Sequence, residues 1–460
     1  MFKRILIANR GEIAIRVIRT CQEMGIETVA VYSTADADSL HTKLATHSVC
    51  IGGPKPDESY LNMEALLSAA LAYHCDAVHP GYGFLSENPD FVRLCEESGI
   101  TFIGPKSEII RAFGDKSNAR KMMIEGGIPV TPGSEGVLSS VEEGMRIAEE
   151  IGYPVLVKAS AGGGGRGMCR IDSPEDFRKK YEEARAESNA CFGSTDLYVE
   201  KLIEKPKHIE IQILADDFGH VVHLGERDCS IQRKNQKMIE ETPSRFLPDE
   251  IRKKMGQTAI DCARAGNYTN AGTVEFLYTD TGDFYFMEMN TRIQVEHAIT
   301  EMVTGIDIVR EQIRIASGLP LDVTQDDICI SGHAIECRIN AENPDEGFIP
   351  CPGKVEFLHL PGGKGVRVDT ALYSGCTVSP YYDSLIAKVV AYGKTRLESL
   401  KIMRRALEEM IIDGIRTNTI FNCLILYDTD FTRGRYDTSF LGKKLSEFVN
   451  WDKLYDEIDY

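Results

Sequence analysis

The sequence predicts an α/β protein with an N-terminal doubly wound (Rossmann-like) domain, a small mobile α+β flap domain and a C-terminal antiparallel-sheet domain. Short apolar runs alternate with helical segments over residues 5–102, a pattern typical of a parallel sheet with crossover helices. Two strand-like segments flank a glycine run at residues 159–168. From residue 208 onward strands follow one another through short turns, which favours antiparallel pairing.

Composition limits the possible functions. The 460 residues carry 52 Lys+Arg against 70 Asp+Glu, a net charge of −18, which argues against nucleic acid and anionic membranes as partners. The 13 cysteines are scattered without a C-x-x-C pair, which fits a reducing compartment. The N-terminus enters a strand-like run without a signal-peptide pattern, and no apolar run reaches the ~18 residues of a membrane span. We therefore expect a cytoplasmic protein.

The N-terminal region reads as strand, helix and strand at residues 4–9, 11–25 and 26–33. The same alternation continues with a helix at 62–75 and ends with a strand at 100–104. At the first turn, ANRGEIA offers only Gly11 where a dinucleotide site would show G-x-G-x-x-G. A nicotinamide or flavin role is therefore poorly supported.

The middle region begins with a helix over residues 115–127, for which Asp115 is a suitable N-cap. A second helix near 141–152 leads to a strand at 154–160, and a short strand follows the glycines at 168–171. A helix over 175–193 and a strand over 197–203 complete this unit.

The glycine run ASAGGGGRGM could be a linker, a P-loop or a flap. A P-loop needs Lys-Ser/Thr after its last glycine, whereas Arg166, Gly167 and Met168 follow here. Linkers rarely join two adjacent strands. We predict a hairpin flap whose backbone N–H groups close over a polyphosphate, with Lys158 and Lys116 as its nearest candidate cations.

In GTVEFLYTDTGDFYFMEMN two strands flank a tight turn, so Glu275 should lie opposite or diagonal to Glu288. Asn290 shares a strand face with Glu288. Like charges ~4 Å apart would cost about 4 kcal/mol at an effective dielectric near 20, so a cation is expected between them. These oxygen ligands suit Mg²⁺; outward-facing acids on a half-exposed sheet are the alternative.

The residues that follow alternate polar and apolar side chains. In an extended conformation Arg292, Gln294 and Glu296 would share one side. Arg and Gln could hold a small oxyanion while Glu296 removes a proton from it. A polar stripe on a solvent-facing strand is the alternative, and we interpret His297 as structural.

Several ordered blocks together resemble biotin carboxylase, a member of the ATP-grasp group: KRILIANRGEIA, HPGYGFLSEN, KASAGGGGRGM, EMNTRIQVEH and PYYDSLIAK. The resemblance extends to about residue 446. It implies an N-terminal domain over residues 1–113, an ATP-grasp domain over 114–330 that includes the flap at about 131–203, a C-terminal domain over 331–446 and a tail over 447–460.

The resemblance also implies roles for individual residues. ATP would contact Lys116, Lys158, Gly162, Gly163, Gly164, Gly165, Arg166, Gly167, Glu200, Lys201, Leu202, Ile203, His208, Gln232, Asn235, Glu275 and Glu288. Mg²⁺ or Mn²⁺, expected as two ions, would bind Glu275, Glu288 and Asn290; bicarbonate would bind Lys237, Arg292, Gln294 and the Val295 backbone; biotin would lie near Tyr82 and Arg338. The catalytic set is Lys237, Arg292, Arg338 and the base Glu296, with Asp383 in support.

One position departs from the family pattern. QRKNQKM carries Asn235 where family members often have histidine. Because asparagine still forms hydrogen bonds, we expect altered nucleotide affinity and retained activity.

The implied reaction is ATP- and bicarbonate-dependent carboxylation of biotin through carboxyphosphate. The sequence contains no Ala-Met-Lys-Met-like segment, so we expect a separate biotin carboxyl carrier protein, with carboxyltransferase subunits and a homodimer as further partners. Acetyl-CoA carboxylase, which supplies malonyl-CoA for fatty acid synthesis, is the favoured system, and a split pyruvate or other acyl-CoA carboxylase is the alternative. Another ATP-grasp carboxylate–amine ligase and a regulatory nucleotide-binding protein are the competing hypotheses.

Overall fold

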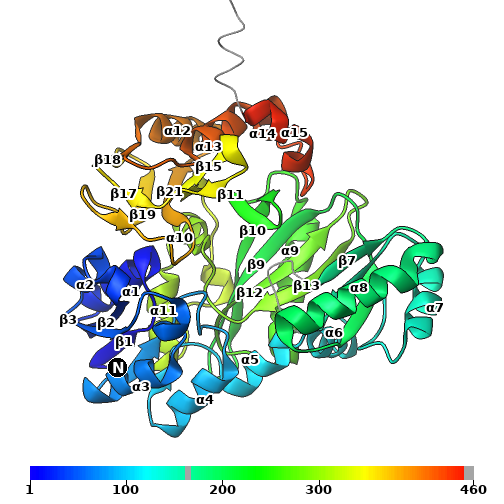
Figure 1. Cartoon of the computed structure of the whole chain (residues 1–460), viewed down its shortest axis with the longest axis horizontal. Helices are drawn as coiled ribbons and strands as arrows, with labels where there is room; N and C mark the ends of the chain where they lie inside the picture. The colour runs from blue at the N-terminus through cyan, green and yellow to red at the C-terminus, as the bar shows by residue number, and fades with distance from the viewer. Residues whose placement is uncertain (161–166, 450–460) are drawn as a thin grey trace, which may run out of the picture.

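The computed structural model describes residues 1–160 and 167–449. The chain forms three lobes: the N-terminal lobe in blue, a projecting lobe in green and cyan, and a C-terminal lobe in yellow to red (Figure 1). Among the helices of the described ranges, none is both long enough and apolar enough to cross a membrane.

The N-terminal lobe is a five-stranded parallel sheet in the order β3-β2-β1-β4-β5, which confirms the predicted doubly wound class. Helices cover both faces, so central residues such as Ile5, Leu6 and Ile7 are buried as a continuous apolar run. The elements are β1 (Arg4–Ile7), α1 (Gly11–Glu23), β2 (Glu27–Ser33), α2 (Leu40–Leu44), β3 (His47–Gly52), α3 (Met63–Ala72), β4 (Ala77–His79), α4 (Pro89–Glu97), β5 (Thr101–Phe102) and α5 (Ser107–Gly114).

The carboxyl edge of this sheet is where doubly wound folds place ligands. Here Arg10, just after β1, binds Asp36 through Nε and Nη2 at 2.6 and 2.8 Å. The Tyr382 ring, from the C-terminal lobe, lies 4.1 Å from the Arg10 guanidinium carbon, and its hydroxyl bonds Ser33 Oγ at 2.5 Å. These side chains therefore join the N-terminal and C-terminal lobes.

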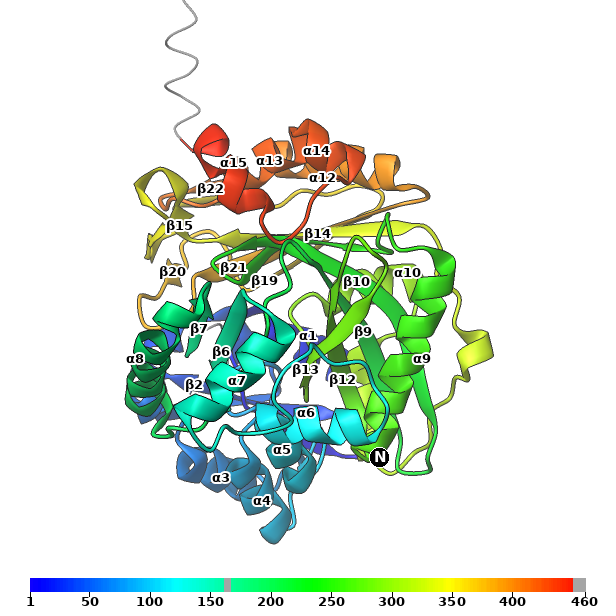
Figure 2. The ribbon, with the colours of Figure 1, turned by 90° about the vertical axis from the view of Figure 1, so that its right-hand side faces the viewer.

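The projecting lobe holds the antiparallel sheet β7-β6-β8. Two helices lie against it (Figure 2), and their apolar faces share one small core with the strands. Asp115 caps α6 by accepting from the backbone of Asn118, as predicted. The elements are α6 (Lys116–Glu125), which precedes the lobe, then α7 (Val141–Ile151), β6 (Val155–Ala159), β7 (Met168–Ile171), α8 (Pro174–Phe192) and β8 (Leu197–Lys201).

The largest sheet runs β13-β12-β9-β10-β11-β14-β21-β19, with antiparallel neighbours throughout. The predicted C-terminal strands are antiparallel, but they continue this central sheet through the β11–β14 pair. A division at residue 331 therefore crosses one continuous sheet. The strands are β9 (Lys207–Ala215), β10 (Val221–Arg233), β11 (Gln236–Thr242), β12 (Asn270–Tyr278), β13 (Phe284–Asn290), β14 (His333–Asn340), β19 (Val366–Thr370) and β21 (Leu385–Gly393).

The C-terminal end of this sheet has one apolar and one charged face. Ile335, Cys337 and Val389 pack on helices that lie above the strands (Figure 2). The alternate residues Glu336, Arg338 and Lys388 face the interior of the molecule, because successive side chains of a strand point to opposite faces. The remaining helices are α9 (Asp249–Ala265), α10 (His297–Thr304), α11 (Ile308–Ala316), α12 (Arg396–Glu409), α13 (Thr419–Tyr427), α14 (Thr429–Arg433) and α15 (Phe440–Phe448).

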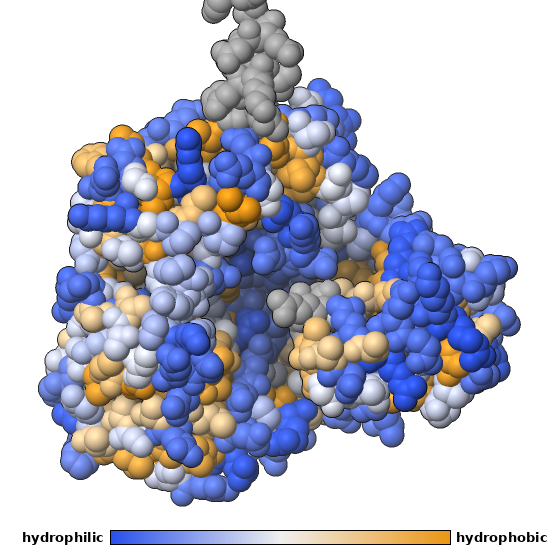
Figure 3. All heavy atoms as spheres, in the orientation of Figure 1, coloured by the Kyte–Doolittle hydropathy of each residue, from blue (hydrophilic) through white to orange (hydrophobic). Residues whose placement is uncertain are grey.

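Short two-stranded ribbons complete the C-terminal lobe: β15 (Glu342–Asn343) with β16 (Ile349–Pro350), β17 (Gly353–Lys354) with β20 (Thr377–Val378), and β18 (Phe357–His359) with β22 (Ile411–Asp413). A hydrophilic hollow lies between the lobes on the face shown in Figure 3.

Candidate active site

The hairpin β12–β13 places two carboxylates side by side. Glu275 pairs directly with Glu288, and Thr273 pairs with Asn290, which confirms the predicted register. Lys116 Nζ lies 3.4 Å from Glu288 Oε2. Lys237 Nζ lies 2.9 Å from Glu275 Oε1, so each of the two acids has a lysine beside it, while the metal ion expected between them stays a prediction.

The donor set at this hairpin fits a magnesium ion. Glu275, Glu288 and Asn290 all supply hard oxygens from one pair of strands. Asn290 Oδ1 accepts from Arg292 Nη2 at 3.0 Å. The side chain of Glu288 keeps 34% of its surface exposed, so its carboxylate is accessible from solvent.

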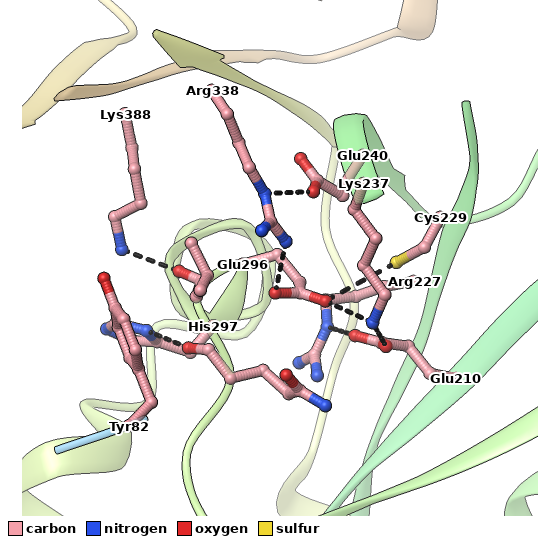
Figure 4. A network of polar contacts seen from close by, with 12 residues as sticks. Tyr82, Glu210, Arg227, Cys229, Lys237, Glu240, Glu296, His297, Arg338 and Lys388 are labelled. Atoms are coloured by element: carbon pink, nitrogen blue, oxygen red, sulfur yellow. Dashed lines mark hydrogen bonds and ion pairs between the residues drawn. The ribbon is translucent and has the colours of Figure 1, made fainter. Parts of the chain in front are cut away.

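The centre of the site is one lysine among three carboxylates. Lys237 Nζ lies 2.5 Å from Glu210 Oε2, 2.9 Å from Glu275 Oε1 and 2.7 Å from Glu296 Oε1. Burial alone would lower the pKa of Lys237, but the three carboxylates raise it well above its ordinary value. The ammonium group is therefore a fixed positive charge in the interior (Figure 4).

Glu296 lies between that lysine and Arg338. Arg338 Nη2 donates to Glu296 Oε2 at 2.9 Å, and its Nε donates to Glu240 Oε1 at 2.6 Å. Burial alone would raise the pKa of Glu296, but Lys237, Arg338 and Arg227 lower it well below its ordinary value. Glu296 is therefore ionised at neutral pH, the state that a proton acceptor needs.

The prediction of an extended strand at residues 292–296 is wrong. The chain turns after β13, and Glu296 is the N-cap of α10 with φ −82° and ψ 12°. The turn still connects the predicted side chains, since Arg292 Nη1 donates to Gln294 Oε1 at 2.9 Å and Gln294 Nε2 donates to Glu275 Oε1 at 3.2 Å. A helix N-terminus gathers these groups where we expected strand alternation.

His297 is structural, as predicted. Its Nδ1 lies 2.8 Å from the Gln294 carbonyl, and burial together with nearby cations lowers its pKa well below the ordinary value. The neutral ring helps to hold the turn that carries Glu296.

Polar groups expected along a nucleotide line the neighbouring strands. Lys158 forms an ion pair with Glu200, and Glu200 accepts from Thr131 Oγ1 at 2.9 Å. His208 Nε2 lies 3.0 Å from Glu275 Oε2, and Gln232 Nε2 lies 2.7 Å from His208 Nδ1. This row thus connects with the Lys237 cluster through Glu275.

The side chain of Lys201 is engaged elsewhere. Its Nζ donates to the carbonyls of Gly152 and Tyr153 at 2.9 and 3.0 Å, and its backbone N–H donates to Pro132 at 2.7 Å. The N–H of Leu202 donates to Pro154 at 3.2 Å. If residues 200–203 contact ATP as predicted, the side chain of Lys201 and the N–H groups of Lys201 and Leu202 are already engaged within the protein, which leaves backbone groups such as those of Ile203.

The glycine run is flanked by the predicted hairpin. β6 and β7 pair with Lys158 opposite Met168, and Ala159 N–H donates to the Gly167 carbonyl at 2.8 Å. Gly167 has φ +68°, a conformation that favours glycine. Gly162, Gly163, Gly164, Gly165 and Arg166 lie outside the described residues.

Two further predicted residues stand apart from the Lys237 cluster. The Tyr82 hydroxyl donates to Glu12 Oε1. Asn235 (φ 64°) and Lys234 (φ 47°) form the two-residue turn between β10 and β11. Asparagine is favoured at positive φ in such turns, so Asn235 satisfies the backbone, while its effect on nucleotide affinity stays a prediction.

Sequence reasoning missed several charged partners of the site. Glu210 bonds Lys237 and also Arg227 Nε at 2.5 Å. Glu87 accepts from Arg292 Nε at 2.8 Å. One signal was present: KHIEIQILA alternates polar His208, Glu210 and Gln212 with isoleucines, which marks a strand with one polar interior face. Glu240 and Lys388 carried no such local signal.

The sequence matches three family profiles in order: the biotin carboxylase N-terminal domain over residues 1–110, the carbamoyl-phosphate synthase L chain ATP-binding domain over 115–324, and the biotin carboxylase C-terminal domain over 336–443.

Individual relatives cover nearly the whole chain. A biotin carboxylase from Nostoc sp. is 53% identical, over 96% of this chain and 98% of the relative. A pyruvate carboxylase subunit from Methanothermobacter thermautotrophicus is 51% identical, over 96% of this chain and 90% of the relative. The biotin carboxylase domain dimer of Hydrogenobacter thermophilus 2-oxoglutarate carboxylase, solved with MgADP, ADP and bicarbonate, superimposes with a TM-score of 0.94 at 50% identity, covering 97% of this chain and 99% of that one.

Proposed function

Because the chain belongs to the biotin carboxylase family, an ATP-dependent group of carboxylases, we propose that the Lys237 cluster is where bicarbonate is activated to carboxylate biotin. The observation that carries the proposal is Glu296 between Lys237 and Arg338. This arrangement keeps a carboxylate ionised in a buried place, beside two cations that can hold an anionic substrate.

In the proposed reaction Glu296 takes the proton of bicarbonate. The resulting oxyanion attacks the γ-phosphorus of ATP, ADP leaves, and carboxyphosphate forms. Arg292, Gln294, the Val295 backbone and Lys237 hold bicarbonate during this step. The single ammonium of Lys237 lies beside three carboxylates, so it offsets part of their charge and lowers the repulsion between those acids and an entering anion.

Carboxyphosphate then breaks down to CO₂ and phosphate. Phosphate accepts the ureido proton of biotin, and the biotin enolate attacks CO₂ to give carboxybiotin. Arg338 stabilises the enolate oxygen, and the Glu240 carboxylate at its Nε fixes the guanidinium plane. Tyr82 lies beside biotin.

The nucleotide would bind along the neighbouring strands. Lys116, Lys158 and the glycine run would contact its phosphates, while Glu200, Lys201, Leu202, Ile203, His208, Gln232 and Asn235 would line the rest of the molecule. Glu275, Glu288 and Asn290 would hold Mg²⁺ or Mn²⁺, one or two ions, whose charge would offset that of the phosphates.

The molecule that finally receives the carboxyl group, and the enzyme complex that transfers it, form a separate part of the proposal. We favour a role in acetyl-CoA carboxylase, with a biotin carboxyl carrier protein, carboxyltransferase subunits and a second copy of this chain as partners. A pyruvate or 2-oxoglutarate carboxylase is the alternative, since relatives carry those names. Co-purification of a biotinylated partner, followed by transcarboxylation to acetyl-CoA, pyruvate and 2-oxoglutarate in parallel, distinguishes these systems.

The test of the site is the Glu296→Gln variant. We expect unchanged nucleotide binding and a loss of bicarbonate-dependent ATP turnover by about 10²- to 10⁴-fold, the range for removing a general base. Free biotin should stimulate the wild-type enzyme. Turnover that survives in the variant would reject Glu296 as the base, and a wild-type enzyme that responds to neither bicarbonate nor biotin would favour a carboxylate–amine ligase.

A further inference from the structure

Lys388 is a fully buried lysine at the meeting point of the lobes. It lies on β21, directly opposite Arg338 of β14 on one side and Asp369 of β19 on the other. Its side chain has no exposed surface. A lysine in such a place must be compensated by specific partners.

The partners of Lys388 come from different parts of the chain. Its Nζ donates to the Val295 carbonyl at 2.6 Å and lies 3.3 Å from Glu12 Oε1. The same Glu12 oxygen accepts from the Tyr82 hydroxyl. Asp369 Oδ2 is a more distant neighbour at 3.9 Å. Burial alone would lower the pKa of Lys388, but Glu12, Glu336 and Asp369 raise it above the ordinary value.

The bond to Val295 acts on the base. The Val295 carbonyl belongs to the peptide group that it shares with Glu296, and this group is planar. A charge-assisted hydrogen bond to that carbonyl fixes the orientation of the peptide group and therefore the direction in which the Glu296 side chain projects from the backbone. Figure 4 shows Lys388 pointing toward the start of α10, where Glu296 and His297 lie.

The contact with Glu12 links Lys388 to Tyr82. Glu12 lies in the first turn of α1 and holds Tyr82, the proposed neighbour of biotin. A single ammonium group therefore touches both the peptide of the base and the carboxylate that fixes Tyr82. In the described structure Lys388 is not in the Lys237 cluster, so it does not duplicate the charge that we assign to bicarbonate.

We propose that Lys388 is a positioning residue that holds the Val295–Glu296 peptide for bicarbonate activation and, through Glu12, keeps Tyr82 in register with it. The assignment rests on the proposed function, because it gives Glu296 and Tyr82 the roles argued above. Lys388 itself does not touch substrate. Its loss should disturb bicarbonate and biotin kinetics and spare nucleotide binding.

The experiment is steady-state kinetics of Lys388→Met, which keeps an unbranched side chain as long as the aliphatic part of lysine and removes the ammonium. We expect kcat/KM for bicarbonate to fall about 10- to 100-fold, the equivalent of one hydrogen bond to a charged group, with KM for ATP within about threefold of wild type. Stimulation of turnover by free biotin should fall as well. A lysine with only a structural role would not separate these parameters.

Lys207→Met is the matched control. Lys207 is also largely buried, and its Nζ donates to the Tyr436 carbonyl at 2.8 Å and lies 3.4 Å from Asp228 Oδ2. We expect this variant to lose thermal stability and to keep the wild-type KM values for bicarbonate and biotin.

A second variant, Glu12→Gln, tests the proposal independently in case Lys388→Met does not fold. Glu12→Gln keeps the shape of the side chain and weakens both the lysine contact and the tyrosine contact. If Lys388 acts through Glu12, the double variant should lose less biotin stimulation than the product of the single losses, because the two residues share one interaction.

Three outcomes would overturn the assignment. Lys388→Met could match wild type for bicarbonate and biotin. Its kcat/KM values for ATP, bicarbonate and biotin could all fall by the same factor with every KM unchanged, as a smaller folded fraction alone would produce. Its biotin effect could multiply with that of Glu12→Gln. Each of these leaves wild-type turnover intact and is thus distinct from failure of the proposed function, in which wild type itself shows no bicarbonate-dependent hydrolysis.

Discussion

Replacing Lys237 by methionine should make the stability of the protein depend on pH in a new way. The change removes the ammonium that lies 2.5, 2.9 and 2.7 Å from Glu210, Glu275 and Glu296. It leaves carboxylate oxygens of Glu210 and Glu275, and of Glu210 and Glu296, within 4.8 Å of each other in a buried place.

The magnitude follows from Coulomb's law. These carboxylate oxygens lie within 4.8 Å of one another, a separation at which two unit charges repel by about 3.5 kcal/mol at an effective dielectric near 20, so Glu210 would feel about 7 kcal/mol from its two neighbours. Protonating a glutamate at pH 7 costs about 4 kcal/mol. Arg227 stays beside Glu210, but burial already raises the pKa of Glu210 against the lowering effects of Arg227 and Lys237. Without Lys237 the folded variant should therefore carry one protonated carboxyl group at neutral pH.

The sign of the pH dependence follows. When the pKa of a carboxyl group is higher in the folded state than in the unfolded state, the folded protein binds more protons. The free energy of unfolding then falls by about 1.4 kcal/mol per pH unit as pH rises from the unfolded pKa to the folded pKa. Lys237→Met should therefore melt several degrees lower than wild type, with a larger deficit at about pH 8 than at about pH 6.

The assay is thermal unfolding of both proteins at one scan rate and matched ionic strength. Lys121→Met is the control, since Lys121 Nζ lies 4.0 Å from Glu125 Oε1 and the two side chains are 67% and 68% exposed; such surface pairs contribute about 0–1 kcal/mol. Its deficit should be small and independent of pH. A Lys237→Met variant with the stability and pH slope of that control would refute the reasoning.

Three other predictions concern the strands around the cluster. Gly133→Ala should raise KM for ATP, because the added Cβ would lie 2.3 Å from the Val199 carbonyl oxygen beside Glu200. Gly136→Ala is the control and should leave KM unchanged, since its added Cβ would have its nearest neighbouring atom at 3.7 Å. Equal effects on the two KM values would argue against a nucleotide along β8. Arg338→Gln should reduce biotin carboxylation about 100-fold and retain biotin-independent, bicarbonate-dependent hydrolysis, so a variant that still forms carboxybiotin at the wild-type rate would exclude the enolate role. Burial raises the pKa of Glu240 to about 7 against the lowering effect of Arg338, so wild type loses stability as pH rises between about 5 and about 8, whereas glutamine does not titrate. The melting temperature of Glu240→Gln relative to wild type should therefore rise over this range. A constant difference would contradict that titration.

Local features of the site could be predicted from the sequence. Asp115 caps its helix, and the tight turn after β12 brings Glu275 near Glu288, because each depends on residues close in the chain. The direct pairing of Glu275 with Glu288 also depends on a register shift between Glu275 and Phe276, which the sequence pattern did not predict. The order of the blocks further implied which side chains would meet around Glu296.

The rest depends on pairings that local patterns do not contain. Arg338 and Glu240 are 98 positions apart and meet only because β14 joins β11. The segment around Gln294 alternates like a strand, yet it turns into α10, since its polar groups bond one another across the turn. Lys388 joins three distant segments, and no spacing in the sequence announces that contact.

The most direct test of the account is the fate of bicarbonate oxygen. With ¹⁸O-labelled bicarbonate, MgATP and free biotin, wild-type protein should release inorganic phosphate that carries one bicarbonate oxygen for each carboxybiotin formed, because a bicarbonate oxygen bonds to the γ-phosphorus. Unlabelled phosphate formed in step with carboxybiotin would mean that another nucleophile attacks ATP, and would contradict the proposed site.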